Sequence, residues 1–191
     1  MSQLIRLVRG FPGHPSHPPL TDVSIGAYTV ATLALVLGAL GVEDRKMAYA
    51  GLLALSGGLL AAVPTAITGL LDWLAMPRGT PARLTATWHL AVMVAATITF
   101  AVAWLLQRPG YLDGTVRTGG WVVAVIAEVL LAVGGYLGGT IVFVYGHRVV
   151  GDSARPMAEA LRPGTGDGRI AGGGRLPAGG PGGVPIDQPG G

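Results

Sequence analysis

The chain has 191 residues, of which half are hydrophobic and only 12% are charged. Soluble domains carry about 25% charged residues, so this composition does not suit a water-soluble fold. The absence of cysteine excludes disulfides, thiolate metal sites and cysteine nucleophiles. A net charge of +3 without a basic stripe argues against a nucleic-acid partner.

The first 21 residues predict an N-terminal His/Pro segment outside the membrane. Arg6 and Arg9 interrupt its apolar residues, and no small-residue cleavage site follows. Both features argue against a cleaved signal peptide. We therefore expect the first apolar block to be a retained signal-anchor helix, with His14 and His17 preceding it.

Four apolar blocks follow in chain order, and each has the roughly 20 residues that a membrane-spanning helix needs. The expected spans are residues 23–42, 47–72, 84–106 and 119–145. None shows the period-2 alternation of a membrane strand. The connections are short, which favours antiparallel neighbours. The sequence therefore predicts an all-α membrane protein, a four-helix transmembrane up-down bundle over residues 22–150, with Pro64 kinking its second helix.

Residues 151–191 form a Gly/Pro-rich C-terminal tail with few large apolar residues. Such a composition cannot bury enough surface to offset chain entropy, so we expect a disordered tail. Two interpretations stay open for it: an empty linker, or a segment that orders on a partner.

The alternating helix directions predict that all four histidines and two aspartates lie at one end of the bundle. These residues are His14, His17, His89, His147, Asp22 and Asp72. The histidines suit axial ligation of a haem, such as haem b, between helices. A divalent metal is the second possibility, with ligands drawn from His14, His17, His89, Asp22 and Asp72. Structural polar anchors and proton handling are the remaining interpretations.

Glu128 lies inside the fourth block, away from the histidines. An acid at membrane depth is by default a functional candidate, whereas the alternative is a carboxyl group that hydrogen-bonds to a neighbouring helix. The glycine pairs that begin at Gly134 and Gly138 favour close helix contact, within the bundle or between protomers.

Several motifs resemble one bacterial family. The chain segment Gly13–Asp22, the run Gly69-Leu70-Leu71-Asp72-Trp73, His89 and the run Gly135-Tyr136-Leu137-Gly138-Gly139 are similar to the membrane proteins catalogued as domain of unknown function 2231. The resemblance implies a four-helix protein of the bacterial cytoplasmic membrane without an established activity. Some relatives are joined to a Rieske iron–sulfur domain, which implies redox partners. Thr140, Ile141 and His147 depart from the closing motif.

The leading hypothesis is a haem- or metal-binding, redox-associated membrane protein in which Asp72 and Asp22 orient the histidine ligands. The first alternative is a non-catalytic scaffold or partner subunit, and the second is a small transporter or proton conductor that uses Glu128. Expected partners are the lipid bilayer and a redox membrane complex or a second copy of the chain. No nucleophile or phosphate-loop motif predicts an enzyme. The Lys and Arg distribution favours cytoplasmic termini, although Arg45 and Lys46 count against it.

Overall fold

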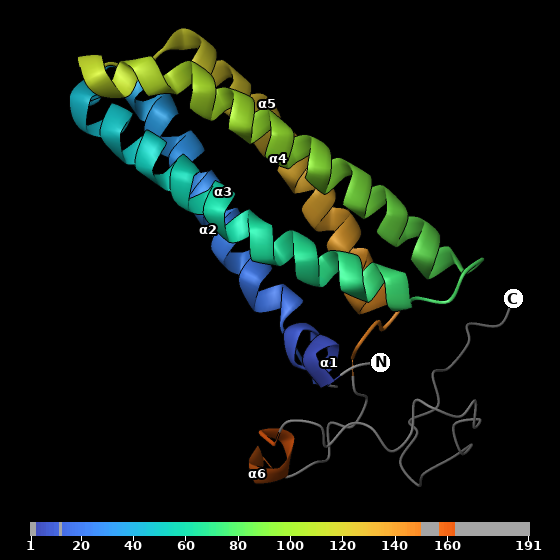
Figure 1. Cartoon of the computed structure of the whole chain (residues 1–191). Coiled ribbons are helices and arrows are strands. Elements are labelled where there is room, and N and C mark those ends of the chain that lie inside the picture. The colour runs from blue at the N-terminus through green and yellow to red at the C-terminus, as the bar shows by residue number, and fades with distance from the viewer. Residues whose placement is uncertain (1–2, 12, 150–156, 163–191) are drawn as a thin grey trace, which may run out of the picture.

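The computed structural model describes residues 3–11, 13–149 and 157–162. Four long helices form an antiparallel bundle (Figure 1). They are α2 (His17–Ala39), α3 (Asp44–Ala75), α4 (Pro81–Asp113) and α5 (Thr118–Gly139), the last continuing as the π-helix η1 (Thr140–Val144). All four are long and apolar enough to cross a membrane. The predicted four-helix transmembrane bundle is therefore confirmed.

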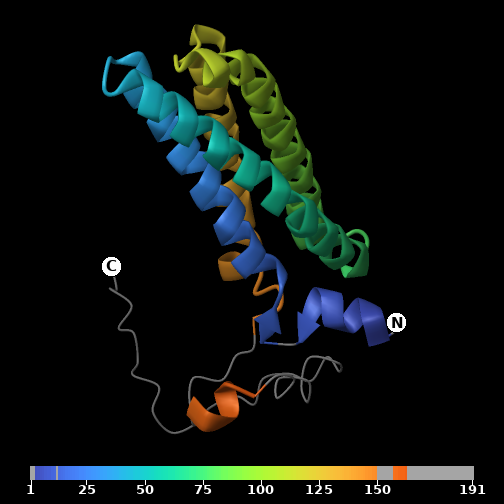
Figure 2. The ribbon, with the colours of Figure 1, turned by 60° about the vertical axis from the view of Figure 1, so that its left-hand side comes forward.

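The N-terminal segment contains structure that the sequence did not predict. The short helix α1 (Gln3–Arg9) leads into an antiparallel pair of two-residue strands, β1 (Gly10–Phe11) and β2 (His14–Pro15). Figure 2 shows α1 lying across the end of the bundle rather than along it. The predicted disordered tail lies outside the described residues, apart from residues 157–162 with the single-turn helix α6 (Met157–Ala160).

Two helices run further than the apolar blocks indicated. α2 begins at His17 rather than at residue 23, so His17 belongs to the helix instead of preceding it. Pro18 and Pro19 fit its first turn because the N–H groups there have no intrahelical partner. α4 continues beyond residue 106, through Pro109, and ends where Gly114 takes a φ of +67°. That left-handed conformation is the usual glycine stop for a helix.

The helices pack as two pairs, α2 with α3 and α4 with α5. Near the middle of the bundle the Tyr28 ring stacks on Phe100, with the ring centroids 4.0 Å apart. Gly58 makes room for this ring, because a Cβ there would lie 2.7 Å from Tyr28 Cδ1. α3 remains one helix through Pro64, and its course bends along its length (Figure 1). Large apolar side chains such as Leu53 and Phe143 face outward, where they contact lipid.

One end of the bundle, which we call the far end, carries the turns between α2 and α3 and between α4 and α5 (Figure 1). Gln107 is fully buried there, where it donates from Nε2 to Thr115 O (3.0 Å) and accepts at Oε1 from Arg117 N (2.9 Å). Asp44 Oδ1 accepts from Val116 N at 2.7 Å. The Asp44 hydrogen bond joins the two turns, and the Gln107 hydrogen bonds hold the α4–α5 turn against α4, so that the far end is closed.

Candidate functional site

The opposite end, the histidine end, contains a cavity of about 970 Å³ between the α2–α3 pair and the α4–α5 pair. Its lining includes every one of the six polar residues that the helix directions place together: His14, His17, His89, His147, Asp22 and Asp72. The rest of the lining is mostly apolar. A concave, largely apolar pocket with a few convergent polar groups is the usual form of a small-molecule site.

His17, the first residue of α2, is fixed against α3. Its Nδ1 lies 3.1 Å from Thr65 O and 3.2 Å from Thr68 Oγ1. A carbonyl oxygen only accepts hydrogen bonds, so Nδ1 carries the hydrogen and the neutral ring keeps its lone pair on Nε2. Gly69 permits this close approach, because a Cβ there would lie 2.7 Å from His17 Cε1. Thr21 Oγ1 stands 3.5 Å from Nε2.

His89 on α4 repeats this arrangement against α5. Its Nδ1 donates to Gly134 O at 2.8 Å, which again leaves the lone pair of the neutral ring on Nε2. A Cβ on Gly138 would lie 3.1 Å from His89 Cε1, so a small residue is needed beside this ring as well. Each helix pair therefore holds one imidazole of fixed orientation at the same cavity.

The other two histidines differ from this pair. His14 is exposed in β2, whereas His147 follows η1 and is half-buried. The Nε2 atom of His147 is buried and forms no hydrogen bond with any of the described residues. Burial lowers the pKa of His147 below its ordinary value of 6.5; Asp72 opposes this shift, and the charges of Arg148 and Arg9 reinforce it.

Asp72 is the centre of an ion-pair cluster at the cavity mouth. Its Oδ1 accepts from Arg9 Nε and from Arg148 Nη1, each at 2.8 Å. Arg148 also donates from Nη2 to Gly10 O (3.0 Å) and Phe11 O (3.3 Å). Asp72 thus accepts hydrogen bonds from two arginines rather than from a histidine ring. The groups that orient His17 and His89 are main-chain carbonyls. The cluster fastens the N-terminal strands and the segment after η1 to α3.

The predicted metal ligands are not grouped as a ligand set in this structure. Within residues 3–11, 13–149 and 157–162, no three His, Asp or Glu side chains are placed to share a metal ion. Asp22 is exposed and takes part in none of the hydrogen bonds or ion pairs described for this part of the chain.

Residues 13–151 match a family model described as "Predicted membrane protein (DUF2231)". The chain belongs to this family. The match runs from the turn before β2 to the end of the bundle, so it contains all four histidines and both aspartates. No curated protein and no solved structure matches the chain.

In this DUF2231 protein Glu128 lies apart from the cavity, on the side of α5 that faces α2. Thr29 Oγ1 donates to its Oε1 at 2.8 Å, and Thr32 Oγ1 lies 3.3 Å from its Oε2. Both threonines belong to α2. The carboxyl group therefore joins two helices, which is the structural alternative considered for an acid at this depth.

Sequence reasoning missed the roles of Arg9, Arg148, Gly69 and Gly138. In the sequence, Arg9 and Arg148 bear only on the orientation of the chain in the membrane. Nothing in their spacing indicates that both would pair with the carboxylate of Asp72. The glycines stand in the family motifs, and small residues on a membrane helix are a signal of close packing with a neighbouring helix, although they do not indicate which side chain packs there.

Proposed function

We propose that this DUF2231 protein binds haem b, which His17 and His89 would hold, and takes part in membrane electron transfer. One observation carries the proposal: both imidazoles bind a main-chain carbonyl of the neighbouring helix through Nδ1, and both line one cavity with the lone pair on Nε2. Histidine ligands are typically fixed in this way, because the second nitrogen sets the tautomer and the ring orientation.

The arrangement fits haem better than a divalent metal ion. Structural zinc takes four protein ligands and catalytic zinc takes three, whereas haem needs only one or two axial ligands from the protein. The cavity is largely apolar, as the macrocycle is. Arg148 lines it too, and its positive charge suits the carboxylates that haem carries.

Bound haem would supply one-electron chemistry, and the side chains would control its setting. His17 and His89 would ligate, Thr65 and Gly134 would hold the ring orientations through their carbonyls, and the apolar lining would keep water away. A bacterial cytoplasmic membrane with both chain termini in the cytoplasm completes the proposal, on the basis of the Lys and Arg distribution.

The test is the absorption spectrum and metal content of the full-length protein, purified from haem-supplied cells. We expect a strong Soret band in the wild type and its loss in His17→Ala and in His89→Ala. The matched control is His14→Ala, because His14 is exposed and its removal should leave the band unchanged.

Three outcomes separate the alternatives. Stoichiometric metal without a Soret band would replace haem with a metal ion. Wild-type protein that contains neither, and that binds no added haemin, would overturn the proposal and leave a scaffold for partner proteins or for a second copy. A Soret band that persists in both histidine variants would overturn the ligand assignment.

A further inference from the structure

The cavity extends well beyond the histidines, into the middle of the membrane. Its deeper lining includes Tyr28 of α2, Val63 of α3, and Val94 and Ile98 of α4. At about 1.5 Å per residue, Val63 and Val94 lie about 18 Å and about 20 Å from the ends of their helices at the histidine end. The apolar core of a bilayer is about 30 Å thick, so this part of the cavity is near mid-depth.

The deep part of the cavity opens sideways between α3 and α4. Val63, Val94 and Ile98 line the cavity and are also 59%, 48% and 59% exposed on the outer surface, so they form its rim. Figure 1 looks onto this side, with α3 and α4 drawn in front of α5. The rim lies at the level of the lipid chains, and a molecule that is dissolved in the bilayer core can enter there.

A buried hydroxyl without a partner lies at the same level. Tyr28 is only 1% exposed, and its hydroxyl makes no hydrogen bond of regular geometry to any of the described residues. Thr97, which also lines the cavity, is a polar neighbour of this hydroxyl but is not placed for a regular hydrogen bond. An unpaired buried donor costs about 1–3 kcal/mol, and native structures seldom leave one without a use.

We infer that the deep part of the cavity binds an isoprenoid quinone, which enters between α3 and α4 and accepts a hydrogen bond from the Tyr28 hydroxyl on a ring carbonyl. The ligand must be uncharged and apolar to reach mid-depth, yet it must carry an acceptor there. Phospholipid carbonyls lie at the interface, whereas a quinone is wholly dissolved in the bilayer core. This site uses neither His17 nor His89, so it does not depend on the haem proposal.

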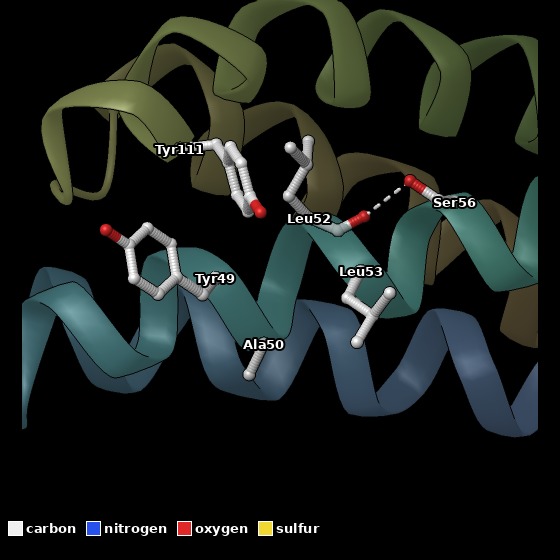
Figure 3. A pocket seen from close by; sticks show the side chains of 6 residues that line it. All are labelled: Tyr49, Ala50, Leu52, Leu53, Ser56 and Tyr111. Atoms are coloured by element: carbon white, nitrogen blue, oxygen red, sulfur yellow. Dashed lines mark hydrogen bonds between the residues drawn. The ribbon is translucent and has the colours of Figure 1, made fainter.

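A second apolar groove serves as a comparison for the Tyr28 site. Figure 3 shows this groove of about 370 Å³ on the far half of the bundle, between Tyr49 of α3 and Tyr111 of α4. Ser56 there donates to Leu52 O and accepts from Trp104 Nε1, both at 2.8 Å. Among the described residues, no buried polar atom in this groove lacks a partner. It therefore supplies control positions rather than a site.

The experiment titrates the full-length protein in detergent with decylubiquinone, against empty micelles. We expect saturable binding to the wild type and about tenfold weaker binding to Tyr28→Phe, which keeps the ring and removes only the donor. Val63→Trp combined with Val94→Trp should slow the binding of decylubiquinone after mixing at least tenfold, by narrowing the opening. The controls Tyr49→Phe and Leu53→Trp, in the other groove, should bind as the wild type does.

Each contrary result is decisive. No saturable binding to the wild type, or equal binding by Tyr28→Phe, would overturn the quinone site. An unchanged rate of binding to the double tryptophan variant would overturn the sideways entry. A markedly lower thermal midpoint for Tyr28→Phe would show that the hydroxyl has a structural partner, which would also contradict the inference. The Soret band of Tyr28→Phe should equal that of the wild type, so failure here and failure of the haem proposal are separately visible.

Discussion

The two ends of the bundle use their polar residues in opposite ways. At the far end, the side chains of Gln107 and Asp44 form hydrogen bonds with the main chain of the turn between α4 and α5. At the histidine end, His17 and His89 each bind a main-chain carbonyl through Nδ1, and neither Nε2 is bound to the main chain; that of His17 has only the long 3.5 Å contact to Thr21 Oγ1. A buried polar group that is fully paired serves the fold, whereas one left with a lone pair at a cavity can serve a ligand.

At both ends of the bundle, glycines make room for a polar side chain from a neighbouring helix. A Cβ on Gly120 would lie 2.7 Å from Gln107 Oε1, so the glycine admits the amide that closes the far end. Gly69 and Gly138 instead admit the imidazole rings at the histidine end. Glycines therefore allow a side chain to close the bundle at the far end, and allow histidine rings to line a cavity at the histidine end.

The largest expected effect on stability comes from the far end. Gln107→Leu removes both hydrogen bonds of a fully buried amide and leaves Thr115 O and Arg117 N unpaired. Thr115 and Arg117 belong to an exposed turn, so the loss is that of the two hydrogen bonds themselves. At about 1–1.5 kcal/mol for each bond, we expect a loss of about 2–3 kcal/mol. Thermal unfolding in detergent measures it, with exposed Arg108→Leu as the control. A wild-type midpoint for the Gln107 variant would contradict the closed far end.

A smaller loss is expected at the histidine end. Asp72→Asn takes the negative charge from between Arg9 and Arg148, whose side chains are only 13% and 15% exposed. Charge-assisted hydrogen bonds of this kind contribute about 2 kcal/mol. The N-terminal segment should then become accessible to protease under conditions that leave the wild type intact. Equal cleavage of the two proteins would show that the cluster does not fasten that segment.

His147 should make the histidine end sensitive to acid. Its folded-state pKa lies below the ordinary value of 6.5 because it is buried near Arg148 and Arg9, with Asp72 in partial opposition. The unfolded chain thus takes up a proton first as the pH falls, so the stability from neutral His147 is present above about pH 6.5 and is lost below it.

We therefore expect His147→Gln to lose less thermal stability between pH 8 and pH 5 than the wild type does. The exposed His14 provides the control, because His14→Gln should keep the wild-type pH dependence. A His147 variant with undiminished acid sensitivity would assign that sensitivity to other groups.

The smallest effect is expected at Glu128, which belongs to neither end. A glutamine there can still accept from Thr29 and can donate to Thr32, so the contacts to α2 survive in Glu128→Gln. Membrane hydrogen bonds of this kind average about 0.6 kcal/mol, and we expect a midpoint close to that of the wild type. Proton flux through liposomes that depends on Glu128 would instead support the transport alternative.

The sequence was sufficient for the bundle and for the meeting of its histidines, because both follow from the lengths and directions of four apolar blocks. It failed where polar contacts decide the outcome. His17 was expected to precede the first helix because the apolar block begins only at residue 23, whereas the helix starts at His17 with Pro18 and Pro19 in its first turn. The contact of His17 with Thr65 O depends on how α2 and α3 are aligned along their axes. A local sequence pattern does not give that alignment.

The ion-pair cluster was equally hidden from the sequence. Asp72 was expected to orient a histidine, but its partners are Arg9, which precedes the bundle, and Arg148, which follows it. Arg148 does so from a left-handed backbone, with a φ of +60°. Such a conformation is uncommon for a residue other than glycine, and tertiary contacts determine it rather than local preference.

The measurement that tests the central claim most directly is the electron paramagnetic resonance spectrum of the ferric protein after addition of one equivalent of haemin. Ligation by His17 and His89 together predicts a low-spin signal that His17→Ala and His89→Ala each convert to high spin or abolish. The far-end variant Gln107→Leu should keep the low-spin signal at temperatures at which it is folded. A high-spin wild type, or a low-spin signal unaffected by either histidine variant, would contradict the assignment of the histidine end as a haem site.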